Sequence, residues 1–359
     1  MSTINFLELL WLFHVAKELF KDNHESKKGG DPVMKRHILI SIVMASVITA
    51  LGFEMGHAKV NRLRIATATM GGTWYPMGVG FANLITEKLK NEGITMTAQS
   101  SAGSIENINM LREGETDLAM LIGFLGKMAW DGMGQFQGKA FKGFRSVVAL
   151  QTNLRHDVIL SDKVKTGTFA DLEGMHYNVG AAGSGAEQTI GIIMKALNIK
   201  IKPEHLGYSQ AVEAIKDRRI DGGTFAAVPP VAGVTDLFNS PTKVTLLNFT
   251  QQQLDQINAT LNAWIMMTIA VNTYPRQTKP VQTLGEPIFV GCRADLEGDV
   301  IYKVLKALYA NIDEMAKVHA QAKAFFQKVE GLPIPLHPGA LRYWKEQGLT
   351  IPAHLMTQP

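Results

Sequence analysis

The sequence predicts an α/β protein of two similar lobes with a cleft between them, and three observations support this fold class. A chain of 359 residues has room for two domains, because domains usually contain about 100–200 residues. Segments of strand and helix character alternate along most of the chain. One unit also occurs twice, since Ser104, a helix and Asp117 recur as Ser209, a helix and Asp221. Open α/β sheets bind ligands at the carboxyl ends of their strands, so we expect a ligand site where the two lobes face each other.

The first half of the chain contains four predicted strands and two predicted helices. Apolar and β-branched runs predict strands at 63–69, 94–99, 117–122 and 146–152. Pro76 suits the first turn of a helix whose apolar residues recur at helical spacing. A second helix is expected from Ser104 to about Arg112.

The second half continues the alternation of strands and helices. We expect a strand at 177–181, a helix at 186–197, a strand at 287–292 and a long helix at 299–318. Residues 59–155 and 286–359 are assigned to lobe I, and residues 156–285 to lobe II. The strands that connect the lobes are expected near 146–157 and 284–292.

The N-terminal segment predicts export from the cytoplasm. Basic residues at 34–37 precede an apolar run from Ile38 to Phe53 and the small residues Gly56 and Ala58. These are the three parts of a secretory signal peptide. We therefore expect residues 34–58 to be a signal peptide that is cleaved after Ala58, which makes the mature protein periplasmic.

Two alternatives concern this N-terminal segment. The apolar run could remain as a membrane anchor, but a spanning helix needs ~20 apolar residues and this run is shorter. Residues 1–33 precede the signal peptide as a leader without an assigned role. Either translation begins at Met34, or residues 1–33 are an unusual leader.

The composition argues against several classes of function. The formal net charge is +4, without basic blocks or aromatic-rich basic stripes, so we expect no nucleic-acid partner. Cys292 is the only cysteine, so an internal disulfide and a cysteine-based zinc site are excluded, and we interpret it as a small core residue. The histidines lack metal-ligand spacing, and His337, which lies between prolines, is expected to cap or pack locally. No H-E-x-x-H or G-x-S-x-G motif occurs, so we expect no catalytic activity. We also expect a monomer that binds neither a metal nor a cofactor.

Three glycine-rich junctions between a strand and a helix form the candidate site. They are Gly71-Gly72, the segment that ends at Ser104, and Gly183-Ser184-Gly185. The start of a helix presents unpaired N–H groups and about half a positive charge, and glycine lets a ligand approach that backbone closely. Hydroxyl groups accompany the junctions, namely Thr69, Thr73, Ser101, Ser104 and Ser184. This combination favours a carboxylate, which binds several directed donors.

Each junction also has a purely structural interpretation. Ser184 and Glu187 match the S-x-x-E capping box, and Ser104 is a suitable N-cap. Gly71 and Gly72 can simply shape a turn. The occurrence of three junctions at equivalent topological places favours a shared ligand site over three independent caps.

Several neighbouring residues also have two interpretations. Trp74 and Tyr75 follow the first junction and either close over a ligand or pack at its rim. Arg145 and Arg155 flank the predicted connecting strand, and each either pairs with a ligand carboxylate in a bidentate manner or lies on the surface. Asp117 and Asp221 hold equivalent positions in the repeated unit, which favours a structural role over acid–base chemistry.

Several motifs occur in order along the chain. They are Gly71–Pro76 (GGTWYP), Ser101–Asn107 (SAGSIEN), Gly183–Glu187 (GSGAE), Thr273–Gln277 (TYPRQ) and Gly331–Ala340 followed by Arg342-Tyr343-Trp344. Together they resemble the TAXI family, the solute receptors of tripartite ATP-independent periplasmic (TRAP) transporters, over about residues 63–349. The resemblance implies a two-lobe fold like that of type II periplasmic binding proteins. It also implies a receptor that closes on a small carboxylate, such as glutamate or glutamine, and delivers it to membrane subunits driven by an ion gradient.

The resemblance further implies which residues contact the ligand. On the first junction these are Thr69, Gly72, Thr73 and Tyr75. On the second they are Ser101, Ser104 and Asn107, and on the third Gly183, Ser184, Gly185 and Gln188. The implied partners are the small carboxylate and the TRAP membrane subunits.

One segment departs from the pattern of that family. After Asp117-Leu118-Ala119 the family usually has polar residues, whereas this chain has Leu121-Ile122-Gly123-Phe124. If this segment touches the ligand, the pocket is more apolar and the ligand less polar than glutamate. Two other functions remain open on the same fold. An enzyme would need a nucleophile or an acid–base set in the cleft, and a periplasmic sensory module would need a signalling partner.

Overall fold

A computed structural model describes residues 61–318 and 321–356. Its strands are β1 (Asn61–Ala66), β2 (Ile94–Gln99), β3 (Leu118–Ile122), β4 (Phe144–Leu160), β5 (His176–Asn178), β6 (Lys202–Glu204), β7 (Gly222–Ala227), β8 (Val244–Leu246), β9 (Ile265–Ile269) and β10 (Val281–Arg293). Its α-helices are α3 (Trp74–Leu89), α4 (Ser104–Glu113), α5 (Gly123–Asp131), α6 (Gly185–Leu197), α7 (Tyr208–Lys216), α8 (Ala232–Asn239), α9 (Gln251–Thr260), α10 (Gly298–Ala310), α11 (Ala322–Phe325) and α12 (Pro338–Glu346). The expected leader (1–33) and signal peptide (34–58) lie outside the described residues. Within the described ranges, none of the helices combines the length and the apolar character that a membrane span requires.

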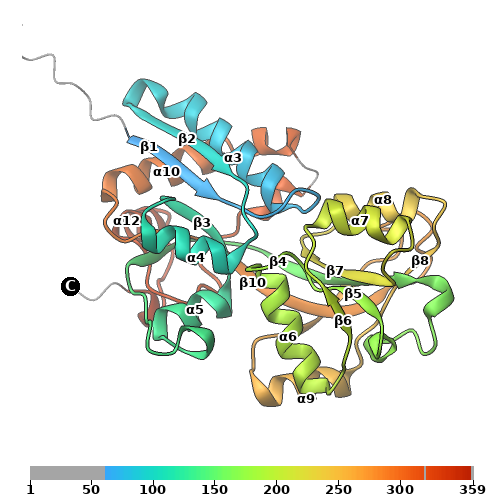
Figure 1. The fold of residues 1–359 in the computed structure, drawn as a ribbon. Helices are drawn as coiled ribbons and strands as arrows, with labels where there is room; N and C mark the ends of the chain where they lie inside the picture. Colours follow the sequence, from blue (N-terminus) through green and yellow to red (C-terminus); the bar gives the residue numbers. More distant parts are fainter. Residues whose placement is uncertain (1–60, 319–320, 357–359) are drawn as a thin grey trace, which may run out of the picture. The chain divides into compact units, whose positions relative to one another are not determined.

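The first lobe is built on strands in the order β2-β1-β3-β10. Strands β1, β2 and β3 are parallel, and β10 pairs antiparallel to β3. Helix α3 buries Phe81, Leu84 and Ile85 at helical spacing against this sheet, as the sequence pattern predicts. The C-terminal helices α10 and α12 return to the same core, so both ends of the described chain build this lobe (Figure 1).

The second lobe repeats this plan with strands in the order β6-β5-β7-β4. Strands β5, β6 and β7 are parallel, and β4 pairs antiparallel to β7. Apolar cores cover both faces of the sheet. One contains Val212 of α7 and Leu237 of α8, and the other contains Ile193 of α6 and Leu254 of α9. The unit that occurs twice in the sequence therefore corresponds to a strand order that occurs twice in the structure.

Strands β4 and β10 run through both lobes and pair with each other (Figure 1). Ala149 of β4 and Phe289 of β10 belong to the core of the first lobe. Leu154 of β4 and Leu284 of β10 belong to the cores of the second. The chain is thus an α/β protein of two lobes that two continuous strands connect, as the sequence predicts.

Asp117 and Asp221 have the equivalent structural roles that the repeat suggested. Oδ2 of Asp117 accepts the backbone N–H of Arg64 at 2.8 Å, and Oδ2 of Asp221 accepts the backbone N–H of His176 at 3.0 Å. Arg64 lies in β1 and His176 in β5, which are equivalent strands of the two lobes. Each aspartate therefore joins the turn before its own strand to the neighbouring parallel strand.

The expected helix at 299–318 is wrong in its length. Helix α10 ends at Ala310, and a short 3₁₀ segment, Ile312–Lys317, follows it. The side chain of Asn311 donates to the carbonyl oxygen of Ala307 at 2.8 Å. This is the acceptor that the backbone N–H of residue 311 would use in a continuing helix, so the side chain competes with the helix and ends it.

His156 of β4 is a buried neutral histidine. Its Nδ1 lies 3.0 Å from the carbonyl oxygen of Phe225, so Nδ1 carries the proton, and its Nε2 lies 2.8 Å from the hydroxyl of Tyr274. That hydroxyl accepts the N–H of Val231 and donates to Nε2. Burial lowers the pKa of His156 from 6.5 to about 4, opposed only in part by the hydrogen bond to Phe225.

We expect the protein to lose stability on acidification because the unfolded chain binds a proton at residue 156 that the folded chain excludes. The loss begins near the unfolded pKa of 6.5 and is complete below the folded pKa of about 4. Between pH 7 and pH 5 this one group accounts for about 2 kcal/mol. Urea unfolding of the wild type and of His156→Gln at several pH values checks this. The slope of the free energy of unfolding against pH should correspond to nearly one fewer proton bound on unfolding in the variant. Equal slopes would show that residue 156 is protonated in the folded state.

Candidate functional site

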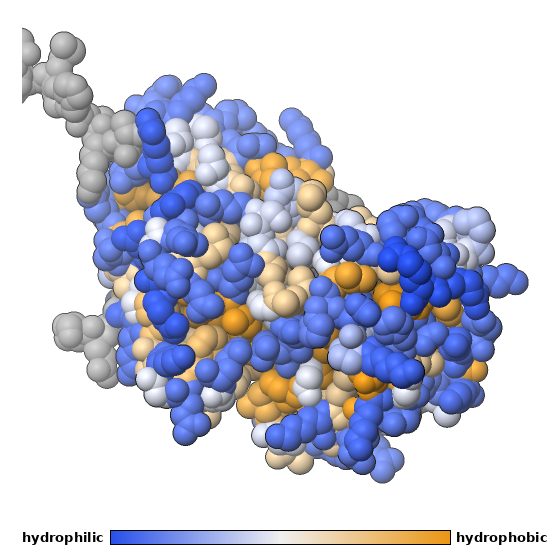
Figure 2. Space-filling view, viewed as in Figure 1, coloured by the Kyte–Doolittle hydropathy of each residue, from blue (hydrophilic) through white to orange (hydrophobic). Residues whose placement is uncertain are grey.

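A narrow cavity lies where the two lobes meet; its volume is about 30 Å³, or about 440 Å³ when the open space at its mouth is counted. It is lined by Ala68, Thr69, Gly72, Thr73, Trp74, Ala102, Gly103, Ser104, Ile122, Asn153, Ala181, Ser184, Gly185, Ala186, Tyr208, Ala226 and Ala227. None of these residues is acidic or basic. On the surface, residues of intermediate hydropathy lie between the two lobes and hydrophilic residues frame them (Figure 2).

Four helices begin at this cavity. Trp74, Ser104, Gly185 and Tyr208 are the first residues of α3, α4, α6 and α7, and all four line it. The first N–H groups of a helix have no acceptor within the helix, and each N-terminus carries about half a positive charge. The backbone therefore makes the cavity attractive to an anion without any basic residue in its wall.

The first predicted junction contributes three of its four expected residues to the cavity. Thr69, Gly72 and Thr73 line the wall, and Tyr75 does not. The hydroxyl of Thr73 donates to the carbonyl oxygen of Val228 at 2.6 Å, which ties this loop to the second lobe. Thr73 thus holds the loop in place, and Thr69 and the Gly72 backbone face the cavity.

The second junction brings only Ser104 to the cavity. Ser101 and Asn107 are buried behind it and bond to each other at 2.6 Å. The amide of Asn107 donates to the carbonyl oxygens of Thr67 and Met120, both at 2.8 Å. These two predicted residues therefore connect β1, β3 and the start of α4, and their polar groups are used within the protein.

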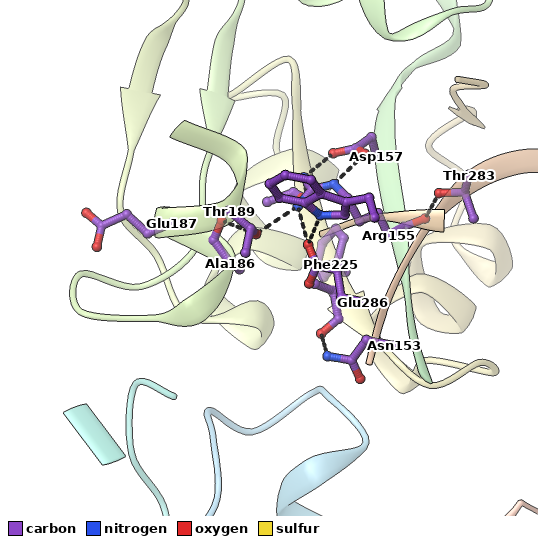
Figure 3. Close-up of polar contacts among 12 residues, drawn as sticks. Asn153, Arg155, Asp157, Ala186, Glu187, Thr189, Phe225, Thr283 and Glu286 are labelled. Atoms are coloured by element: carbon purple, nitrogen blue, oxygen red, sulfur yellow. Dashed lines mark hydrogen bonds and ion pairs between the residues drawn. The ribbon is translucent and has the colours of Figure 1, made fainter. Parts of the chain in front are cut away.

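The third junction brings Ser184 and Gly185 to the cavity, while Gly183 and Gln188 lie outside its lining. The serine half of the predicted capping box is present, while Glu187 bonds the residue before the N-cap instead of the N-cap itself. Oγ of Ser184 accepts the N–H of Glu187 at 3.0 Å, and the carboxylate of Glu187 accepts the N–H of Gly183 at 2.8 Å. The Glu187 side chain points away from the cluster that contains Thr189 (Figure 3).

Both cavity serines have a structural role that is compatible with ligand binding. Oγ of Ser104 accepts the backbone N–H of Ile122 at 3.0 Å and caps no helix, so its expected role as the N-cap of α4 is wrong; Gly103 holds that position. Oγ of Ser184 likewise accepts an N–H group. A hydroxyl has one donor and two acceptor positions, so each serine keeps its hydrogen for a ligand oxygen. The structural and the functional interpretation of these serines therefore hold together.

The lobes touch across the cleft through backbone atoms. The N–H of Gly233 donates to the carbonyl oxygen of Gly71 at 3.0 Å, and the N–H of Glu106 donates to that of Gly183 at 3.2 Å. Such close approach depends on glycine residues, which have no side chain. A Cβ added at Gly72 would lie 3.2 Å from the ring of Tyr208. The structure therefore shows the cleft in a closed form.

Several cavity residues were not identified from the sequence. Asn153 accepts the indole N–H of Trp74 at 3.1 Å, so the aromatic residue at the first junction is fixed against a connecting strand. The hydroxyl of Tyr208 accepts the N–H of Ala226 at 2.7 Å. Tyr208 precedes Ser209 of the repeated unit, so a comparison of the two copies could have found it. No local pattern marks Asn153 or the lining alanines.

The apolar departure in the first lobe reaches the cavity. Ile122 lines the wall and Phe124 packs against Trp264 of the second lobe at a ring distance of 5.1 Å. Ile122 thus adds an apolar side chain to the wall, and its contact with a ligand stays a prediction.

Neither arginine considered as a ligand partner lines the cavity. Arg145 lies over the ring of Trp130, 4.8 Å from its centroid. Arg155 is fully buried, and its guanidinium lies 3.0 Å from Asp157 and 3.6 Å from Glu286 (Figure 3). Arg155 therefore pairs with carboxylates of the protein, on both connecting strands.

This buried cluster contains one cation and two carboxylates. The guanidinium of Arg155 also donates to Thr224 at 2.7 Å, and Asp157 accepts the hydroxyl of Tyr177 at 3.1 Å. Burial raises the pKa of Glu286, although Arg155 opposes this shift. Burial lowers the pKa of Arg155, but Asp157 and Glu286 outweigh it and raise the pKa overall. The cluster therefore retains its cation, and burial favours the protonated form of Glu286.

The remaining predicted features are structural. Cys292 is buried in the core, and burial raises the pKa of its thiol. Nδ1 of His337 accepts the N–H of Gly339 at 3.2 Å, so this histidine caps α12 as expected. Among residues 61–318 and 321–356, no group of three or more histidine, cysteine or acidic side chains is arranged to hold a metal ion.

The chain is similar to several solved structures. An ancestral arginine-binding protein bound to arginine is 17% identical with a TM-score of 0.45, over 74% of this chain and 99% of that one. A TRAP periplasmic solute-binding protein from a Sulfitobacter species with bound β-D-galacturonate is 14% identical with a TM-score of 0.43, over 74% and 84%. The periplasmic aliphatic sulphonate binding protein of Escherichia coli is 14% identical with a TM-score of 0.38, over 74% and 73%. The model of the NMT1-like family matches residues 65–348. The chain therefore belongs to the NMT1-like family.

Proposed function

We propose that this chain is an extracytoplasmic solute receptor that binds a small carboxylate-bearing ligand, an amino acid or an organic acid, in the cavity between its lobes. The observation that carries the proposal is the meeting of four helix N-termini at one cavity. Ser104 and Ser184 are buried there, and neither hydroxyl donates to an acceptor among the described residues. A carboxylate satisfies both serines and the helix ends at once.

We place the carboxylate beside the contact between the starts of α4 and α6, which supports this position. Gly185 lies against Ser104, because a Cβ added at Gly185 would be 2.9 Å from the Ser104 hydroxyl oxygen. The starts of α4 and α6, one from each lobe, therefore meet within a few ångströms. An anion at this point neutralises both ends and holds the lobes together.

The transport role rests on the TAXI-like motifs of the sequence. We propose that the receptor is exported by the segment 34–58, works in the periplasm as a monomer, and delivers its ligand to TRAP membrane subunits. Lobes of residues 59–155 with 286–359 and of 156–285 would open and close about β4 and β10. Membranes that carry TRAP subunits should then take up the bound acid only when this protein is present.

Substitution of Ser184 separates ligand binding from helix capping. Ser184→Asp keeps an oxygen that caps α6 but replaces the hydroxyl donor with a negative charge, so we expect stability within about 0.5 kcal/mol of the wild type and loss of acid binding. Ser184→Ala should lose about 1 kcal/mol of stability and about tenfold in affinity. Thermal unfolding and calorimetric titration measure the two quantities.

Ser184→Asn is the matched control for charge. It has nearly the size of aspartate, caps a helix equally well and carries no charge, so it should bind acids better than Ser184→Asp. If Ser184→Asp binds acids as tightly as the wild type does, Ser184 is a cap only and the carboxylate lies elsewhere.

A further inference from the structure

Beyond the two serines, the wall of the cavity has no acidic or basic side chain. Alanine methyl groups from both lobes and the side chain of Ile122 form much of it. Its other side chains are uncharged, namely Thr69, Thr73, Trp74, Asn153 and Tyr208. A charged group placed against such a wall loses its hydration and gains no side chain of opposite charge in return. Only the starts of the helices, where the serine hydroxyls of α4 and α6 also lie, favour a charge among the residues that line the cavity, and that charge is negative.

Two of the acceptors at the cavity are already bonded. The carbonyl oxygen of Ala226 accepts from the hydroxyl of Tyr208 and from the amide of Asn153, both at 3.3 Å. The side-chain oxygen of Asn153 accepts the indole N–H of Trp74. An ammonium group has three donors and no acceptor, so it would compete for oxygens that are in use.

The electrostatics of the backbone act in the same direction. Four helix N-termini attract a first negative charge and repel a positive one. A second carboxylate would lie away from the hydroxyls of Ser104 and Ser184 and would meet no basic side chain in the wall. An α-ammonium and a second carboxylate are therefore both left without a side chain of opposite charge.

We infer that the cavity selects organic monoanions, with a single carboxylate at the starts of α4 and α6 and an uncharged, mainly apolar remainder, over amino acids and dicarboxylates. This inference rests on the proposed function and narrows it, since the proposed function includes amino acids. The carboxylate accepts from the hydroxyls of Ser104 and Ser184 and from the first N–H groups of α6. The carbon chain packs against Ile122 and the alanine methyls.

The test compares ligands with the same carbon chain and different charges. Calorimetric titration of the purified protein at pH 7.5 uses butyrate, L-2-aminobutyrate, succinate and butyramide. Hexanoate, L-norleucine and adipate repeat the comparison for a longer chain. We expect a monocarboxylate to bind at least about tenfold more tightly than the amino acid and the diacid of the same length, because each added charge is left unpaired. Butyramide, which is neutral, should not bind detectably.

The two ways of failing are distinguishable. If an amino acid or a diacid binds as tightly as the monocarboxylate of its length, the inference is overturned and the proposed receptor function stands. If no acid of either set binds, or if butyramide binds as well as butyrate, the proposed anion site itself is wrong.

Discussion

Arg155→Met is expected to lower the free energy of unfolding by about 3–5 kcal/mol. Arg155, Asp157 and Glu286 have fully buried side chains, and the guanidinium is the cation that faces both carboxylates. Its removal leaves two carboxylates in a low-dielectric interior and leaves Thr224 and Thr189 without their donors. Urea unfolding monitored by circular dichroism measures the loss.

Glu286→Gln is the matched control within the same cluster. Its size is unchanged, the oxygen that accepts the indole N–H of Trp264 at 3.0 Å is retained, and a charge that burial disfavours is removed. The second oxygen of Glu286 has no hydrogen-bond partner among the described residues, so little bonding is lost. We expect a change of less than about 1 kcal/mol. A loss below about 1 kcal/mol for Arg155→Met as well would show that the cluster is hydrated rather than buried.

Gly185→Val is expected to weaken acid binding by about 100-fold with little change in the stability of either lobe. A Cβ at this position would lie 2.6 Å from Cδ1 of Ile122 and 2.9 Å from Oγ of Ser104, across the cleft. Overpacking of this kind costs about 1–3 kcal/mol, and every 1.4 kcal/mol is tenfold in affinity. Gly185→Ala, which adds one carbon, should lose about tenfold. Calorimetric titration with the tightest-binding acid measures both.

Gly191→Ala is the control because it lies in the same helix and its added Cβ would meet nothing within 4 Å. This variant should bind as the wild type does and be slightly more stable, since alanine favours a helix over glycine. If Gly185→Val binds as tightly as Gly191→Ala, the two lobes do not need to approach at this point for ligand binding.

The elements that the sequence predicts well are those fixed by local pattern. Helices α3, α4 and α6 follow from apolar residues at helical spacing beside a glycine or serine junction, and their starts agree with the structure within two residues. Strands β4 and β10 extend beyond the predicted segments. Their outer parts are defined by pairing with β7, β8 and β9, and such pairing leaves no trace in a single strand.

The candidate site was predictable in its backbone and less so in its side chains. The junctions at Gly72, Ser104 and Gly185 meet as expected, because equivalent turns in two equivalent lobes face each other. In the sequence, nothing distinguishes Ser101 and Asn107 from residues that contact a ligand. Their partners lie in β1 and β3, and only the folded sheet brings these strands together.

Arg155 shows the same limit for charged groups. An arginine on a connecting strand is a reasonable partner for a ligand carboxylate when only the sequence is known. One of its acceptors, Asp157, is two residues away, and the other, Glu286, is distant in sequence. Long-range pairing between β4 and β10 therefore decided the role of this residue.

A crystal structure of the protein with its tightest-binding acid tests the anion site most directly. The account predicts a carboxylate between the starts of α4 and α6, with its oxygens within hydrogen-bond distance of the hydroxyls of Ser104 and Ser184 and the N–H of Gly185. An acid bound instead in the groove of about 730 Å³ beside β4, which Gln151 and Met267 line, would contradict it. So would an acid in the predicted cavity whose carboxylate faces solvent and leaves both serines unbonded.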